Sequence, residues 1–235
     1  MKKLLDVFLG SVSKPNPLIR FAWISEDYEP DEKSEVLAVR GEPSEQGTLK
    51  LYFDSAIKTE IDAIFNAVKN RGKRINQERP FKFGFGAQTA YWHYLNFFQK
   101  RSKFRFSYDD PFGSYYNRPY DFRIFFPKLA FWLEIKSQIP NMSMCRYFIS
   151  PYYSYPEYVV CVRVLNEEMT NYEIYGFCTG EDVQKIPHGV YHEIPVDREH
   201  FRVYSEFHTK ILKLPLLERF DNEHYTQEET EKTEE

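Results

Sequence analysis

Apolar and polar positions alternate along this chain with two spacings, and each spacing predicts a different kind of element. One stretch, residues 55–70, has apolar residues three or four positions apart, which predicts an amphipathic helix. The residues on its apolar face are Ile57, Ile61, Ile64, Phe65 and Val68. Gly72 follows and is expected to end this helix.

Shorter apolar runs bounded by polar or turn residues predict strands. They are Leu18–Ile24, Val36–Val39, Thr48–Phe53, Lys103–Tyr108, Tyr120–Phe126, Leu129–Lys136, Tyr158–Val164 and Tyr172–Cys178. Three more helices are predicted: one from an N-cap at Thr89 to Arg101, a short one at Gly180–Ile186, and one at Glu199–Leu214. This order of helices and strands indicates an α/β or α+β domain around a mixed sheet.

The predicted elements and the charge divide the chain into three parts. Residues 1–54 form a strand-rich N-terminal extension, residues 55–220 the core domain, and residues 221–235 an acidic tail. The tail has seven acids against one lysine and almost no apolar residues, so we expect it to be disordered. The whole chain has a net charge of −4, so the part before the tail is slightly positive.

The cysteines and the absence of long apolar stretches bear on the compartment. Cys145, Cys161 and Cys178 are widely spaced and form no CxxC pair, which favours reduced, partly buried thiols, although a disulfide between two of them is an alternative. No apolar stretch reaches transmembrane length, and Asp6 interrupts the short apolar run near Met1. We therefore expect a cytoplasmic protein without a membrane partner.

The segment from Arg118 to Gln138 combines two apolar strands with charges on one face. If the chain turns at Pro127 and Lys128 so that Phe126 pairs with Leu129, then Asp121 lies directly across from Glu134. Strand alternation then separates two sets of side chains. The polar face holds Asp121, Arg123, Trp132, Glu134 and Lys136, and the core face holds Phe122, Ile124, Phe126, Phe131, Leu133 and Ile135.

Two carboxylates that face each other across a strand pair repel, unless a cation lies between them. Mg²⁺ prefers one or two carboxylates together with water and phosphate oxygens, so Asp121 and Glu134 are candidate ligands for Mg²⁺ or Mn²⁺. Such an ion can polarise a phosphate and activate a water molecule. Lys136, on the same face, is placed to orient that water or to neutralise charge that develops on the phosphate.

Asp121 followed by Glu134-Ile135-Lys136 on the next strand resembles the active-site signature of the PD-(D/E)xK nuclease superfamily. The resemblance covers roughly residues 55–186. It implies a restriction-endonuclease-like core: a helix, a three-stranded meander, a helix and a further strand, in a central mixed β-sheet flanked by helices. It also implies that Asp121, Glu134 and Lys136 are catalytic, with the two acids as metal ligands.

The chain also departs from the family pattern. Many members carry a further acid on the first core helix, but the helix predicted from Thr89 has none, so Glu60 on the earlier helix is the candidate, ahead of Asp62. The segment after Lys136 contains Pro140 and is a poor helix, which suggests that the core is distorted there. Gln138, on the same face as Lys136, is a candidate for contact with the scissile phosphate or an adjacent base.

The stretch from Lys69 to Arg105 has ten basic residues and one acid, Glu78, and aromatic residues lie among them, including Phe81, Phe83, Phe85, Tyr91 and Trp92. Basic and aromatic side chains together are typical of a nucleic-acid surface; the alternative is a solvated basic face over buried aromatics. The candidate binding residues are Lys73, Arg74, Arg79, Lys82, Lys100, Arg101 and Lys103. Gly84 and Gly86 would let backbone amides approach a phosphate.

The sequence therefore predicts a metal-dependent nuclease that cuts phosphodiester bonds, with DNA as the preferred substrate. The alternative is a catalytically inactive module with the same fold that binds nucleic acid or another protein. A homodimer is a further open alternative, because a duplex offers two strands to cut.

Overall fold

The computed structural model of this chain describes residues 40–70, 78–99, 105–108, 121–126, 129–148, 155–216 and 219–221. The strands predicted at Leu18–Ile24 and Val36–Val39, and the acidic residues from 222 onward, lie outside this part. Within the described ranges, no helix has the length and apolar character needed to cross a bilayer.

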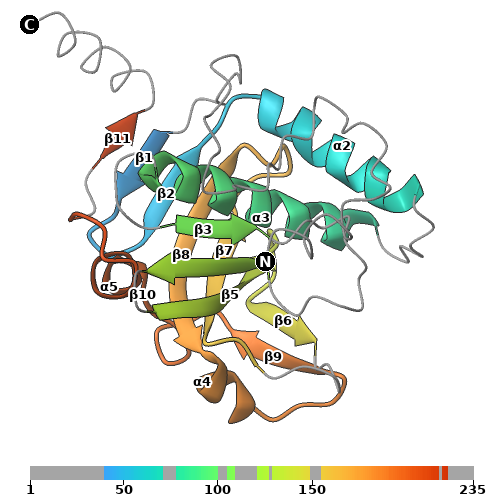
Figure 1. The fold of residues 1–235 in the computed structure, drawn as a ribbon. Helices are drawn as coiled ribbons and strands as arrows, with labels where there is room; N and C mark the ends of the chain where they lie inside the picture. The colour runs from blue at the N-terminus through green and yellow to red at the C-terminus, as the bar shows by residue number, and fades with distance from the viewer. Residues whose placement is uncertain are drawn as a thin grey trace, which may run out of the picture.

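A mixed sheet of nine strands forms the centre of the fold (Figure 1). The strands follow one another across it in the order β11-β1-β2-β8-β7-β5-β4-β3, and β10 also pairs with β8. Its strands are β1 (Arg40–Pro43), β2 (Leu49–Tyr52), β3 (Arg105–Tyr108), β4 (Phe122–Phe126), β5 (Leu129–Gln138), β7 (Tyr158–Val164), β8 (Asn171–Thr179), β10 (Arg202–Val203) and β11 (Phe220–Asp221). The pair β5 and β7 is parallel, and the other pairs are antiparallel.

The three-stranded meander expected from the sequence is present as β3, β4 and β5, and the further strand is β7. The crossover from β5 to β7 differs from the expectation of a helix. In its described part, residues 139–148 and 155–157, the chain instead forms the strand β6 (Met144–Phe148). Pro140, and Asn141 with a φ of 69°, make a turn that no helix could contain.

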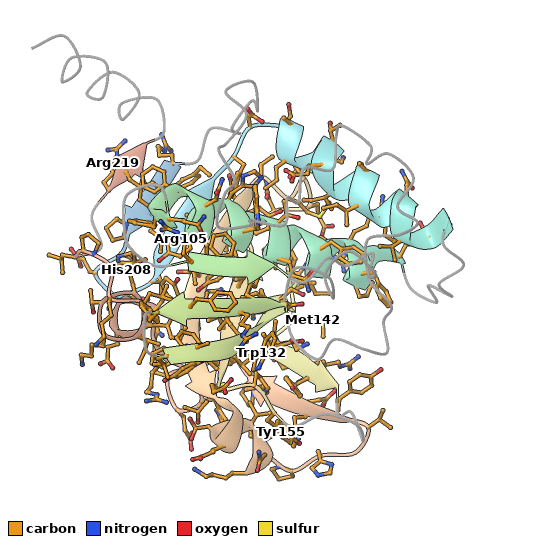
Figure 2. All side chains as sticks on the ribbon, viewed as in Figure 1. Arg105, Trp132, Met142, Tyr155, His208 and Arg219 are labelled. Carbon is orange, nitrogen blue, oxygen red and sulfur yellow. The ribbon has the colours of Figure 1, made fainter. Side chains whose placement is uncertain are left out.

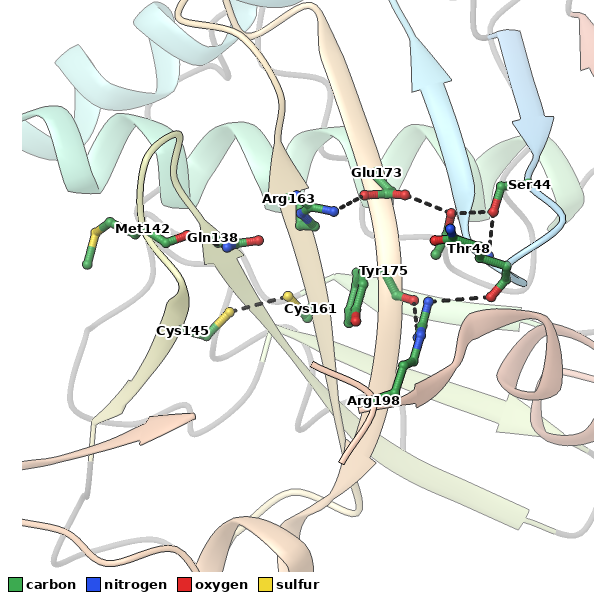
Figure 3. A network of polar contacts seen from close by, with 11 residues as sticks. Ser44, Thr48, Gln138, Met142, Cys145, Cys161, Arg163, Glu173, Tyr175 and Arg198 are labelled. Carbon is green, nitrogen blue, oxygen red and sulfur yellow. Dashed lines mark hydrogen bonds and ion pairs between the residues drawn. The ribbon is translucent and has the colours of Figure 1, made fainter. Parts of the chain in front are cut away.

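The residues assigned to an N-terminal extension join the same sheet as the core where they are described. β2 pairs with β8, from Leu49 opposite Ile174 to Tyr52 opposite Asn171, and β1 pairs with both β2 and β11. A buried polar network supports this junction (Figure 3): Glu173 accepts hydrogen bonds from Thr48 Oγ1 at 2.8 Å and from Arg163 Nη1 at 2.7 Å.

The helix α2 (Ala56–Asn70) confirms the prediction for residues 55–70. All five predicted apolar residues are buried, and Asp54 Oδ1 accepts a hydrogen bond from the N–H of Ala56 at 2.7 Å at the helix start. The helix packs beside α3 (Glu78–Gln99) on one face of the sheet (Figure 1).

The helix α3 begins eleven positions before the predicted N-cap Thr89, which is buried in its interior. Two glycines, Gly84 and Gly86, lie in the first half of this helix. Tertiary packing explains at least one of them: a Cβ at Gly86 would lie 2.9 Å from Tyr172 Oη and 3.3 Å from Ile61 Cδ1. Gly86 therefore lets α3 approach β8 and α2 closely, and the backbone amides of Gly84 and Gly86 belong to a helix, where they are not available as a phosphate loop.

The opposite face of the sheet is covered by a second, two-stranded sheet of β6 and β9 (Tyr191–Pro195), together with α4 (Gly180–Gln184). Successive residues of β7 face opposite sides of the sheet. Val160 and Val162 belong to the hydrophobic core that includes the buried residues of α3, whereas Val159 and Cys161 pack with residues of β6, β9 and α4. The helix α4 lies within the predicted Gly180–Ile186 and has a capping box between Thr179 and Asp182.

The last predicted helix, Glu199–Leu214, is shorter and less regular than expected. It begins as α5 (Tyr204–Glu206) and continues as a π-helix, η1 (Phe207–Ile211). The residues before α5 are not helical. Asp197 Oδ1 accepts hydrogen bonds from the backbone N–H groups of Glu199 and His200, each at 3.0 Å, and Arg202 pairs with β8. These local side-chain bonds compete with a helix at that point.

Candidate active site

The register predicted for β4 and β5 is confirmed. Phe122 pairs with Leu133 and Phe126 with Leu129, so continuation of the ladder places Asp121, which directly precedes β4, across from Glu134. The faces also separate as expected: Phe122, Ile124, Phe131, Leu133 and Ile135 are buried, whereas Arg123 is exposed. The charged face of β5 lies on the side of the sheet away from α3.

Asp121 is held by two hydrogen bonds. Its Oδ1 accepts from Gln88 Nε2 of α3, and its Oδ2 accepts from the backbone N–H of Ile135, both at 2.7 Å. Ile135 lies between Glu134 and Lys136 in the strand, so this bond fixes the Asp121 carboxylate against the backbone of β5, while the bond to Gln88 ties it to α3.

Glu134 and Lys136 form an ion pair between Lys136 Nζ and Glu134 Oε1. Their side chains are 13% and 19% exposed, so this pair is shielded from water far more than a surface pair. Lys136 Nζ also lies over the ring of Tyr147 on β6, 5.0 Å from its centroid. The small sheet of β6 and β9 thus covers part of the charged face, and Tyr147 contacts the ammonium group of Lys136.

Beneath this cover lie the three cysteines, which are free and buried. Cys145 Sγ and Cys161 Sγ are 3.3 Å apart (Figure 3), and Cys161 is the neighbour of Lys136 across the parallel pair. Burial raises the pKa of the Cys178 thiol to about 12 and the pKa of Cys161 well above its ordinary value. The three thiols are more deeply buried than predicted, and the expectation that they are reduced stays a prediction.

Two further site candidates are engaged elsewhere. Glu60 Oε2 lies 2.9 Å from His93 Nε2 of α3, so the structure gives this acid a partner within the helical layer. Gln138 is only 8% exposed, and its amide donates to the carbonyl of Met142 in the turn after β5 (Figure 3). In this structure the Gln138 amide stabilises that turn, and its contact with the scissile phosphate or an adjacent base stays a prediction.

The predicted nucleic-acid surface is only partly described. Lys73, Arg74, Lys100, Arg101 and Lys103 lie outside the described residues. Arg79 Nη2 is 2.5 Å from Glu167 Oε1, and Lys82 Nζ is 2.7 Å from Asp62 Oδ1. Of the interleaved aromatics, Phe83 and Tyr91 are buried in the core and cannot stack on bases.

The donor set suits a hard divalent cation. Asp121 and Glu134 supply two carboxylates, which is the number Mg²⁺ commonly takes from a protein when waters and phosphate oxygens complete its coordination. In the described part of the chain, no group of three or more His, Cys, Asp or Glu residues gathers in a geometry that could hold a metal. A cation held by Asp121 and Glu134 would need further oxygen ligands to complete its coordination.

Sequence reasoning missed Gln88 and Tyr147, the residues that contact Asp121 and Lys136 from α3 and β6. No spacing in the sequence indicates either contact, because each joins segments that meet only in the tertiary structure. Comparison of the chain with protein-family models, with curated proteins and with solved structures finds no match.

Proposed function

We propose that this protein is a Mg²⁺- or Mn²⁺-dependent nuclease that hydrolyses phosphodiester bonds, with DNA as its substrate. The observation that carries the proposal is the bond from the N–H of Ile135 to Asp121 Oδ2, 2.7 Å long, which seats one carboxylate next to the strand that bears Glu134 and Lys136. A restriction-endonuclease-like fold belongs to the same proposal, supported by the meander β3-β4-β5 and the parallel strand β7.

The residues of the site would divide the chemistry among them. Asp121 and Glu134 would hold the cation, and Gln88 would keep Asp121 in one orientation. The bound ion supplies positive charge at the phosphate oxygens and lowers the pKa of a coordinated water. Lys136 would place its ammonium group against the charge that develops on the phosphate.

A cleavage panel tests the proposal. Linear duplex, supercoiled circle, single strand and four-way junction would each be incubated with Mg²⁺, Mn²⁺ or EDTA. We expect metal-dependent cutting by the wild type that falls at least about 100-fold in Asp121→Asn, Glu134→Gln and Lys136→Met. Glu193→Gln is a matched control, because Glu193 also belongs to an ion pair, with Arg146 at 3.0 Å, but lies on the exposed side of β9.

The result that contradicts the proposal is equally definite. If no substrate is cut under any of these conditions while DNA binding persists, the protein is a binding module with a vestigial site. Far-UV circular dichroism and thermal unfolding of each variant show whether a lost activity reflects lost folding.

A further inference from the structure

The outer face of the β3–β5 meander carries an exposed arginine that the proposed chemistry does not use. Arg123 lies on β4 opposite Trp132 of β5, and its guanidinium is 4.9 Å from the ring centroid of Trp132 and 4.9 Å from that of Phe125. Trp132 is labelled on β5 in Figure 2. Two aromatic rings therefore hold the cation in a defined place although it is exposed to water.

Arg123 also differs from other arginines in what it contacts. Arg79, Arg146, Arg163 and Arg202 are each paired with a carboxylate, those of Glu167, Glu193, Glu173 and Asp182. For the Arg123 guanidinium, the described residues provide aromatic rings and no carboxylate or carbonyl acceptor. Glu157, which directly precedes β7, accepts a hydrogen bond at its Oε2 from the backbone N–H of Trp132, at 2.7 Å.

The strand lattice places this arginine beside the candidate active site. Arg123 is two positions from Asp121 along the chain, about 7 Å away on the pleated surface. It is also the diagonal neighbour of Glu134, again about 7–8 Å away. Its guanidinium leans over Phe125, the residue on the other side of Arg123 from Asp121, so it points away from the carboxylate pair.

We infer that Arg123 binds a backbone phosphate of the DNA, the one adjacent to the scissile phosphate on the same strand. An arginine held by aromatic rings, with N–H groups that no described residue accepts, presents a fork that matches the oxygens of a phosphate. The Arg123 guanidinium points away from Asp121 and Glu134, so it would contact the phosphate that neighbours the scissile one. The scissile phosphate itself would be bound by the cation and Lys136. Such a contact fixes the register of the strand over the site without reading its sequence.

This inference rests on the proposed function for the identity of the ligand, and its test is a binding measurement that needs no cleavage. Fluorescence anisotropy with labelled oligothymidylate and with a labelled duplex, in EDTA and across a series of NaCl concentrations, gives both the affinity and its salt dependence. The variants are Arg123→Gln, Arg123→Lys and the control Arg146→Gln. Arg146→Gln removes the same charge from an exposed arginine on β6.

We expect Arg123→Gln to weaken binding at least about tenfold. The slope of log K against log salt should become about one unit shallower. Arg123→Lys should recover the slope but only part of the affinity, because lysine keeps the charge and loses the planar fork. Arg146→Gln should match the wild type in both quantities. The loss should be the same for oligonucleotides of different sequence.

The outcomes separate this inference from the proposed function. Equal affinity and equal slope for Arg123→Gln and Arg146→Gln overturn the inference, even if the wild type cuts DNA. The expected loss in Arg123→Gln supports the phosphate contact, even if no cleavage is found. Absence of DNA binding by the wild type in every salt condition overturns it as well.

Discussion

Lys136 on β5 lies over the aromatic ring of Tyr147 on β6, with 5.0 Å between Nζ and the ring centroid. Tyr147 in turn stacks on Tyr155, with an interplanar angle of 15° and 5.5 Å between the ring centroids. This stack comes from the crossover between β5 and β7, the part of the chain that replaces an expected helix. The small sheet therefore contributes directly to the surroundings of the candidate catalytic lysine.

Replacement of Tyr147 should lower activity through Lys136. Tyr147→Leu removes the ring face that holds the ammonium group, and a cation–π contact is worth about 0.5–2 kcal/mol. We expect kcat in Mg²⁺ to fall by about two- to thirtyfold, with little change in KM. Tyr147→Phe keeps the ring and should retain wild-type kcat. A similar loss in both variants would show that the hydroxyl, and not the ring face, matters.

Loss of Gln88 should weaken metal binding. Its side chain fixes Asp121 Oδ1 through a 2.7 Å hydrogen bond, and removal of a residue that orients a ligand commonly costs about 10- to 100-fold in metal affinity. Gln88→Ala should show this loss in calorimetric titration with Mn²⁺. Asn66→Ala, an exposed substitution on α2, is the control. Unchanged Mn²⁺ affinity in Gln88→Ala would mean that Asp121 does not depend on this bond.

The two glycines of α3 should respond oppositely to alanine. A Cβ at Gly84 meets no atom within 4 Å, so Gly84→Ala should raise the free energy of unfolding by about 0.5–1 kcal/mol through helix propensity. A Cβ at Gly86 would lie 2.9 Å from the hydroxyl of the buried Tyr172, so Gly86→Ala should lower it by about 1–2 kcal/mol. Urea unfolding of both variants measures the difference. Equal stabilisation would refute close packing at Gly86.

The stability of the fold should decrease in mild acid because of His208. This side chain is fully buried, accepts a hydrogen bond from Tyr94 and donates one to the carbonyl of Pro215 at 2.7 Å. Burial lowers its pKa from the ordinary 6.5 to about 4. Between these two values the unfolded chain binds a proton that the folded protein does not, so the free energy of unfolding falls as the pH falls, by up to about 3 kcal/mol.

Urea unfolding across this pH interval, and at one pH above it, measures the effect. His208→Gln does not titrate there and should show a smaller decrease in stability than the wild type. Parallel decreases in both proteins would show that carboxylates, and not His208, account for the acid sensitivity.

The register of β4 and β5 could be predicted because the two strands are joined by a short turn and alternate strictly. A shift by one residue would expose Phe122, Leu133 and their neighbours, so a single pairing buries both apolar sets. The same alternation placed Arg123, Glu134 and Lys136 together on the other face. Local patterns of this kind are sufficient when the partner strand is the next one along the chain.

Other features could not be predicted because their cause lies far away in the sequence. The glycine at position 86 inside α3 is explained by Tyr172 and Ile61, which leave no room for a side chain there. The strands β6 and β9 lie far apart in the sequence, and each needs the other as a partner. Gln88 gives no signal of its own, since a polar residue on a helix is ordinary until Asp121 is placed beside it.

The pairing of β2 with β8 has a consequence for how the protein is made. Roughly 120 residues separate Tyr52 from its partner Asn171, and synthesis at about 5–20 residues per second takes about 6–24 s to cover them. During that time Leu49 and Leu51 have no β8 to pack beside, and the β1–β2 hairpin cannot be stable alone. The nascent chain thus exposes the apolar residues of β2 for seconds. During this interval a chaperone that binds exposed apolar segments would protect the chain from aggregation.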